Sequence, residues 1–149
     1  MNVRDMAGHV IRRLNQHSTH VFAIGAQQAG FDLTPVQFAA LDSIAAHPGV
    51  DQAGIAAQIA CDRATIGGVI DRLEQKGYVS REVSSQDRRR RTVWLTERGE
   101  TVLHDILPVV TDFQDSILPG LDPGERDRFL ALAGKVLGAF EAGVDTSDP

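Results

Sequence analysis

Hydrophobic residues recur every three or four positions over most of the chain, a spacing that predicts amphipathic helices. One such stretch covers Val10–Ile24 and a second begins after Thr34. Thr34, Pro35 and Gln37 have the spacing of a capping box with a proline in the first turn, so we expect a helix to begin there. The His-Pro-Gly sequence at 47–49 predicts its end.

Two short helices joined by a tight turn are predicted next. Asp51 and Asp62 are each placed to accept a hydrogen bond from the first turn of a helix. Apolar residues after Asp62 fall at i, i+3, i+4 and i+7, which puts them on one helix face: Ile66, Val69, Ile70 and Leu73. Gly77 is placed to end this second helix. The pattern is that of a helix-turn-helix.

The hydrophobic period then changes to two, which favours strands over Tyr78–Val83 and Thr92–Leu95. The loop between them is polar and strongly basic, so a β-hairpin with a charged tip, a wing, is expected. A long helix capped by Thr96 is expected to extend to Ile117, and a final helix to begin after Asp122. The predicted fold is mainly α with a small β-hairpin wing, a winged helix-turn-helix, with an optional short strand before the helix-turn-helix.

Charge is distributed unevenly along the 149 residues, whose formal net charge is −5. The segment Asp62–Arg91 holds eight basic and five acidic residues, so it is positive while the remainder is strongly acidic. A basic region on an acidic body favours binding of DNA on one face only. The single cysteine excludes an internal disulfide and a zinc site built from cysteines.

The helix expected over 63–76 has an outward face opposite its apolar stripe, and this face is the candidate DNA-reading surface. Arg63 and Thr65 lie in its first turn, the part that usually reaches base edges, and Arg72 lies further along. Gly67 and Gly68 each cost about 1 kcal/mol relative to alanine in a helix. Close approach of the backbone to DNA or to a neighbouring helix is one reason to accept that cost.

Four consecutive arginines at the predicted wing tip repel one another unless solvent or phosphate neutralises them. An arginine at a hairpin tip can enter a narrow minor groove, and its neighbours can hold flanking phosphates. Asp87 precedes the run and can pair with one of its members, which are Arg88, Arg89, Arg90 and Arg91. The alternative interpretation is a solvated loop or a non-specific polyanion patch.

The stretch from Leu33 to Gly99 resembles the MarR family. The motifs that carry the resemblance occur in order: LTPVQFAAL, then IGGVIDRLEQKGYVSRE, then SSQDRRRRTVWLTERG. The resemblance implies that Asp87 and Arg89 match the aspartate and inserted arginine of the family's wing. It also implies that Arg63, Thr65 and Arg72 belong to a recognition helix in the major groove.

The same resemblance implies a homodimer and a domain organisation. Residues 1–30 and 97–149 are then dimerisation helices, and 31–96 form the winged DNA-binding domain. The expected partner is double-stranded DNA carrying a pseudo-palindromic operator, with half-sites about 10 base pairs apart. Repression is the commoner mode of action in the family.

Many members of the family release DNA when a small aromatic acid binds between the dimer helices and the winged domain. Candidate residues for such an effector lie on the first two helices: Arg13, His17, His20, Phe38 and Asp42. A cation near aromatic rings suits a carboxylate attached to an apolar ring. In the alternative interpretation the histidines lie at an interface or on the surface, and Phe38 belongs to the core.

Other functions remain open at this point. A redox sensor would use Cys61, which precedes a helix N-terminus, although no second cysteine is present to resolve an oxidised thiol. A metal sensor would need ligands beyond the i, i+3 pair His17 and His20. A scaffold that uses the winged fold without DNA is a further alternative. No catalytic motif is found, so no enzyme activity and no cofactor are expected. The N-terminus is too polar for a signal peptide, which predicts a cytoplasmic protein.

Overall fold

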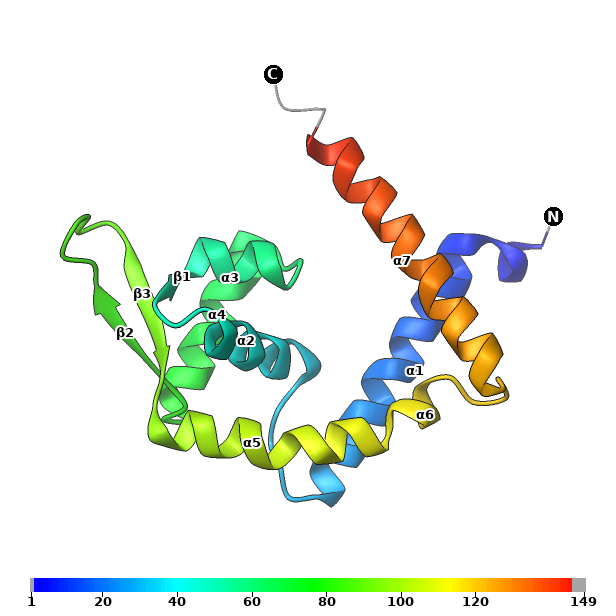
Figure 1. Ribbon diagram of the computed structural model, residues 1–149, viewed down its shortest axis with the longest axis horizontal. Helices are drawn as coiled ribbons and strands as arrows, with labels where there is room; N and C mark the ends of the chain where they lie inside the picture. The colour runs from blue at the N-terminus through cyan, green and yellow to red at the C-terminus, as the bar shows by residue number, and fades with distance from the viewer. Residues whose placement is uncertain (1, 146–149) are drawn as a thin grey trace. The chain divides into compact units, whose positions relative to one another are not determined.

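The computed structural model describes residues 2–145, with side chains up to residue 143 (Figure 1). Contacts divide the chain into two units, with Phe113 as the last residue of the first and Gln114 as the first of the second. The first unit contains a short 3-10 turn, five helices and three strands: Val3–Asp5, α1 (Ala7–Gln28), α2 (Pro35–Ala46), β1 (Val50–Asp51), α3 (Gln52–Gln58), α4 (Arg63–Gln75), β2 (Val79–Val83), β3 (Arg91–Leu95) and α5 (Glu97–Asp112). The second contains α6 (Gln114–Ile117) and α7 (Pro123–Asp145). This order confirms the predicted winged helix-turn-helix.

The strands form one small antiparallel sheet in the order β1-β3-β2. β2 and β3 are the two strands of the wing, and Arg81 of β2 lies opposite Val93 of β3. The short strand β1 adds to the other edge of β3, where Val50 also lies opposite Val93. The central strand therefore connects the wing to the chain segment just before α3.

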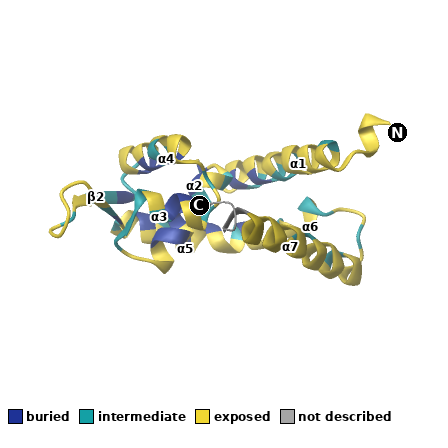
Figure 2. Cartoon of the chain, turned by 90° about the horizontal axis from the view of Figure 1, so that it is seen from above, coloured by how far each residue is buried: buried dark blue, intermediate teal, exposed yellow. Residues whose placement is uncertain are grey.

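The hydrophobic core lies where α2, α3, α4 and α5 meet the sheet, as the dark blue residues of Figure 2 show. The stripe of α4 is buried, with Ile66, Ile70 and Leu73 no more than 2% exposed. They belong to one cluster with buried residues of α2, α3, β2, β3 and α5, which are Leu41, Ile44, Ile55, Val79, Val93, Leu103 and Ile106. Burial of one stripe fixes which side of α4 faces solvent.

The predicted helix starts are confirmed by their hydrogen bonds. Thr34 and Gln37 form a reciprocal capping box at α2, with both bonds at 3.2 Å. The side chains of Asp51, Asp62 and Thr96 accept bonds from the first turns of α3, α4 and α5. A second reciprocal pair, between Asp122 and Glu125, opens α7.

The prediction that the helix after Thr96 extends to Ile117 is wrong. α5 ends at Asp112, because Phe113 leaves helical geometry at φ −94° and ψ 3°. The ring of Phe113 packs edge-on against Phe22 of α1, with centroids 5.6 Å apart. The helix period alone does not reveal this contact between residues far apart in sequence.

Gly99 is required by close packing at the start of α5. A Cβ atom there would overlap the carbonyl oxygen of Tyr78. That carbonyl accepts a hydrogen bond of 3.0 Å from the N–H of Thr96, so it is not free to move.

We predict that Gly99→Ala lowers the free energy of unfolding by about 1–3 kcal/mol, because it forces backbone apart in a packed region. Gly8→Ala in α1 is the control, since no atom lies within 4 Å of its Cβ position. There alanine should be neutral or stabilising by up to about 1 kcal/mol. Denaturant unfolding at one fixed protein concentration measures both, and equal stability of Gly99→Ala and wild type would contradict this account.

Candidate nucleic-acid interface

The first turn of α4 is held by Asp62. One carboxylate oxygen accepts the N–H of Thr65 at 2.7 Å, and the other accepts its hydroxyl at 2.9 Å. The backbone bond from Thr65, followed by the hydroxyl bond, lowers the pKa of Asp62 below its usual value. The hydroxyl proton of Thr65 is therefore committed within the protein, which leaves its lone pairs and its methyl group for contact with a base.

The outward face of α4 carries the residues predicted to read DNA. Arg63, Thr65 and Arg72 are all exposed. The Cβ position of Gly68 has no atom within 4 Å, and that of Gly67 meets only the Gln52 amide at 4.0 Å. Packing against a neighbouring helix therefore does not explain Gly68, and approach to DNA stays as a prediction.

Backbone hydrogen bonds set the shape of the wing tip. The carboxylate of Asp87 accepts the N–H of Arg89 at 2.9 Å, and its carbonyl accepts the N–H of Arg90 at 3.0 Å. The N–H of Ser84 donates to the carbonyl of Arg90 at 2.9 Å and closes the loop. Asp87 thus orders the turn through the backbone rather than through an ion pair with one of the arginines.

Arg90, in the loop at the wing tip, forms an ion pair with a residue outside the hairpin. Nε of Arg90 lies 3.0 Å from Oδ2 of Asp51. The other oxygen of Asp51 accepts the N–H of Gly54 at 2.8 Å and so caps α3. One carboxylate therefore fixes a helix start and tethers the wing to it. The sequence identified Asp51 only as a cap.

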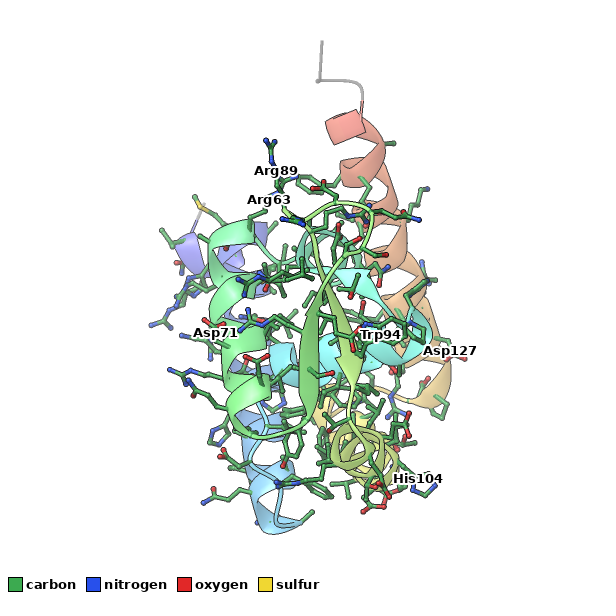
Figure 3. All side chains as sticks on the ribbon, turned by 90° about the vertical axis from the view of Figure 1, so that its left-hand side faces the viewer. Arg63, Asp71, Arg89, Trp94, His104 and Asp127 are labelled. Carbon is green, nitrogen blue, oxygen red and sulfur yellow. The ribbon has the colours of Figure 1, made fainter. Side chains whose placement is uncertain are left out.

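Exposed arginines at the start of α4 and at the tip of the wing form a cationic face. Figure 3 shows Arg63 of α4 and Arg89 of the wing on the same, upper side of the lobe. Within the part of the chain that the structure describes, five arginines of α4 and the wing have no acidic partner: Arg63, Arg72, Arg88, Arg89 and Arg91. All five are exposed, so their charges are available to phosphate.

One charged residue near this face was not anticipated from the sequence. Arg81 of β2 pairs with Asp71 and Glu74, two acidic residues of α4. Its position in a short alternating strand gave no sign of a partner on the recognition helix.

The residues predicted to bind an effector are distributed over α1 and α2. Arg13, His20 and Asp42 are exposed, and His17 is half-buried. Phe38 packs with the core, its ring 5.9 Å from that of Phe22. The structure thus places Arg13, His20 and Asp42 on the surface of the first unit, His17 partly inside it, and the aromatic ring against its core.

A cavity of about 330 Å³ lies elsewhere in the first unit, between the end of α2, β3 and α5. Its walls are mainly apolar and include Trp94, with Glu100 and His104 among the polar residues. None of the five predicted effector residues lines it. Trp94 is held by a 3.1 Å bond from its indole N–H to Thr92. Because it is the single tryptophan of the chain, a change in tryptophan fluorescence reports on the surroundings of this side chain.

Cys61 lies in the turn before α4, where it is half-buried and packs against the core. Among the described residues, no three histidine, cysteine or acidic side chains gather as they would around a metal ion. No helix in the described range is both long and apolar enough to cross a membrane.

Comparisons with known proteins agree with this geometry. The MarR family model matches residues 33–90. The transcriptional regulator HosA of Escherichia coli O127:H6 is 34% identical over 137 residues, which cover 92% of this chain and 98% of HosA.

Two similar structures concern DNA binding directly. BpsR of Bordetella bronchiseptica, whose DNA binding is regulated by 6-hydroxynicotinic acid, is 26% identical with a TM-score of 0.83, over 91% of this chain and 96% of BpsR. The transcriptional repressor CouR, bound to a 23-mer DNA duplex, is 26% identical with a TM-score of 0.81, over 91% of this chain and 94% of CouR.

The tether between Asp51 and Arg90 can be tested without removing the cap of α3. In Asp51→Asn the amide oxygen can still accept the N–H of Gly54, but the ion pair is lost. We predict a change in unfolding free energy below about 1 kcal/mol, because the pair is partly exposed. Backbone amides of residues 84–90 should exchange hydrogen faster, as measured by mass spectrometry.

Asp62→Asn is the matched control, since it alters the cap of α4 and leaves the wing tether intact. Unchanged exchange in the wing of Asp51→Asn would show that Arg90 does not restrain the hairpin.

Proposed function

This chain belongs to the MarR family of transcriptional regulators, and we propose that it represses transcription by binding double-stranded DNA as a homodimer. The observation that carries the proposal is the cationic face, which joins the start of α4 and the wing on one side of an otherwise acidic protein. In this proposal the first turn of α4 enters the major groove and Arg89 enters the adjacent minor groove.

The division of roles follows from the surroundings of each side chain. Arg63 can donate two hydrogen bonds to one guanine, and the methyl group of Thr65 can contact thymine. Arg72, Arg88 and Arg91 supply charge to neighbouring phosphates. Arg90 is paired with Asp51, so its main role in this proposal is to hold the wing in place and not to bind a phosphate. The duplex bound by CouR supports DNA as the partner.

Exposed apolar residues support the homodimer. On α7, Leu132, Val136, Leu137 and Phe140 are 54–68% exposed and lie on one helix face. On α1, Val10, Ile11 and Leu14 are also exposed. Burial of such side chains is worth about 25 cal/mol per Å², so stripes of this kind favour association. Residues 1–30 and 97–149 are accordingly proposed as dimerisation helices around a DNA-binding domain at 31–96.

The proposed effector is a small aromatic acid that weakens DNA binding. Its proposed site combines one cation, three side chains with rings and one carboxylate from α1 and α2: Arg13, His17, His20, Phe38 and Asp42. Regulation of BpsR by 6-hydroxynicotinic acid, a heteroaromatic acid, supports this class of compound. Arg13 is exposed, so it is available for a carboxylate.

The role of the wing is tested with Arg89→Ala on an operator selected from a random pool of duplexes. We predict weaker operator binding and a flatter dependence of log affinity on log salt, by about one unit for each arginine lost and so about two per dimer. Fluorescence anisotropy across a salt titration measures both. Arg12→Ala, which removes an equal charge from α1, is the control. An unchanged salt slope in Arg89→Ala would exclude Arg89 from DNA binding.

The dimer is tested with Leu137→Glu, which places a charge in the exposed stripe of α7. We predict that light scattering reports a mass near 16.1 kDa in place of twice that value, because an unpaired charge is costly to bury. Ala131→Glu, on the opposite face of α7, should remain dimeric. A monomeric wild type, or a dimeric Leu137→Glu, would contradict the proposed interface.

The effector is tested by a thermal-shift screen of benzoates, hydroxybenzoates, cinnamates and 6-hydroxynicotinic acid. A ligand at 100 times its Kd stabilises the protein by about 2.7 kcal/mol, which raises Tm measurably. We predict that Arg13→Gln abolishes the shift and Arg12→Gln retains it. A shift that survives Arg13→Gln and quenches Trp94 would place the ligand in the α2–β3–α5 cavity instead.

A further inference from the structure

Two carboxylates on the recognition helix oppose the proposed function. Asp71 lies on the outward face of α4 and Glu74 lies on its flank, with side chains 55% and 44% exposed. A helix that enters a groove brings such charges close to phosphates, and like charges repel. Something must neutralise them if α4 is to bind DNA.

Arg81 of β2 supplies the positive charge that neutralises these two carboxylates. Alternation along β2 puts its side chain on the same face as buried Val79, and only 15% of the side chain is exposed. A charged group at such a position needs partners, because burial of an unpaired charge is costly. Figure 3 labels Asp71 on the stretch of α4 that lies alongside the wing strands.

All three nitrogens of the Arg81 guanidinium are engaged. Nε and Nη2 donate to the two carboxylate oxygens of Glu74 at 3.4 and 3.1 Å, and Nη2 also donates to Asp71. Nη1 donates to the side-chain oxygen of Gln52 at 2.9 Å. The bond to Glu74 contributes most to raising the pKa of Arg81 above its usual value. The arginine therefore stays charged throughout the pH range in which the protein folds.

These bonds join three elements at one point. Glu74 and Asp71 belong to α4 and Arg81 belongs to β2, the first wing strand. Gln52 is the first residue of α3. The neighbouring residue, Asp51, pairs with Arg90 in the loop at the wing tip. The wing is thus attached to the start of α3 at two points, one in β2 and one in its loop, and to α4 through Arg81.

We propose that Arg81 is a positioning residue for DNA binding: it fixes the wing relative to α4 and neutralises Asp71 and Glu74, which would otherwise repel the phosphates. The inference rests on the proposed DNA-binding function. Arg81 touches no DNA in this scheme and acts through the two carboxylates. A flat fork of donors is needed to reach three partners, so lysine is only a partial substitute.

The test compares Arg81→Gln with the triple variant Arg81→Gln/Asp71→Asn/Glu74→Gln. Each is measured for affinity to the selected operator by fluorescence anisotropy and for Tm by circular dichroism. We predict that Arg81→Gln weakens binding by about tenfold to a hundredfold, since it leaves two unpaired carboxylates. The triple variant should recover most of this loss, because it carries no unpaired charge, and the deficit that remains measures the lost connection between the wing and α4.

Salt dependence separates neutralisation from a purely structural defect. The loss of affinity in Arg81→Gln should shrink as salt rises from 50 to 300 mM, because ions screen the repulsion between carboxylate and phosphate. A misfolded lobe would give a loss independent of salt. Arg81→Lys, which retains the charge, should fall between wild type and Arg81→Gln and keeps the test valid if Arg81→Gln fails to fold.

The outcomes are distinct from those that test the proposed function. If wild type binds no duplex, the proposed function fails and this inference falls with it. If wild type binds and Arg81→Gln binds equally well, Arg81 has no such role. A triple variant as weak as Arg81→Gln would overturn the neutralisation of Asp71 and Glu74.

Discussion

Burial of the apolar stripe of α4 is the constraint on which the rest of the structure depends. Ile66, Ile70 and Leu73 are each worth about 1.5–3 kcal/mol when removed from water, so α4 has one stable rotation about its axis. That rotation directs Arg63 outward. Because Val79 at the start of β2 packs in the same core, the wing also begins from a fixed point. The core therefore sets the relation between the two elements that face DNA in the proposed function.

The charged side chains of the wing and α4 determine which of their charges can attract DNA. Four adjacent arginines at the wing tip repel one another, and an ion pair to Asp51 engages only Arg90. The others remain exposed on a protein of net charge −5, so their attraction to phosphate is confined to one face. On α4 the unfavourable charges are negative: Asp71 and Glu74 would repel phosphate, and Arg81 of the wing strand β2 neutralises both. In α4 and the wing, five arginines are thus exposed without an acidic partner, whereas Asp71 and Glu74 are paired with Arg81.

Much of the fold was predictable because its signals are local. Helix starts at Thr34, Asp62 and Thr96 depend on residues within one turn, and the period of two marks the wing. What the sequence did not reveal depends on contacts between distant positions. Arg90 and Asp51 are 39 residues apart, and the end of α5 at Asp112 is set by packing of Phe113 on α1. The exposed arginines of α4 and the wing were identifiable from the sequence as candidates for DNA contact, but the ion pairs of Arg81 and Arg90 were not.

The central claim is that α4 and the wing form one DNA-binding surface. Footprinting of the wild-type protein on a selected duplex tests it most directly, with dimethyl sulfate to report guanine N7 in the major groove and hydroxyl radicals to report the minor groove. The account predicts two symmetric protected half-sites about 10 base pairs apart, each with a major-groove segment lost in Arg63→Ala and a flanking minor-groove segment lost in Arg89→Ala. A single unsymmetric footprint, or loss of the same protected positions in both variants, would contradict it.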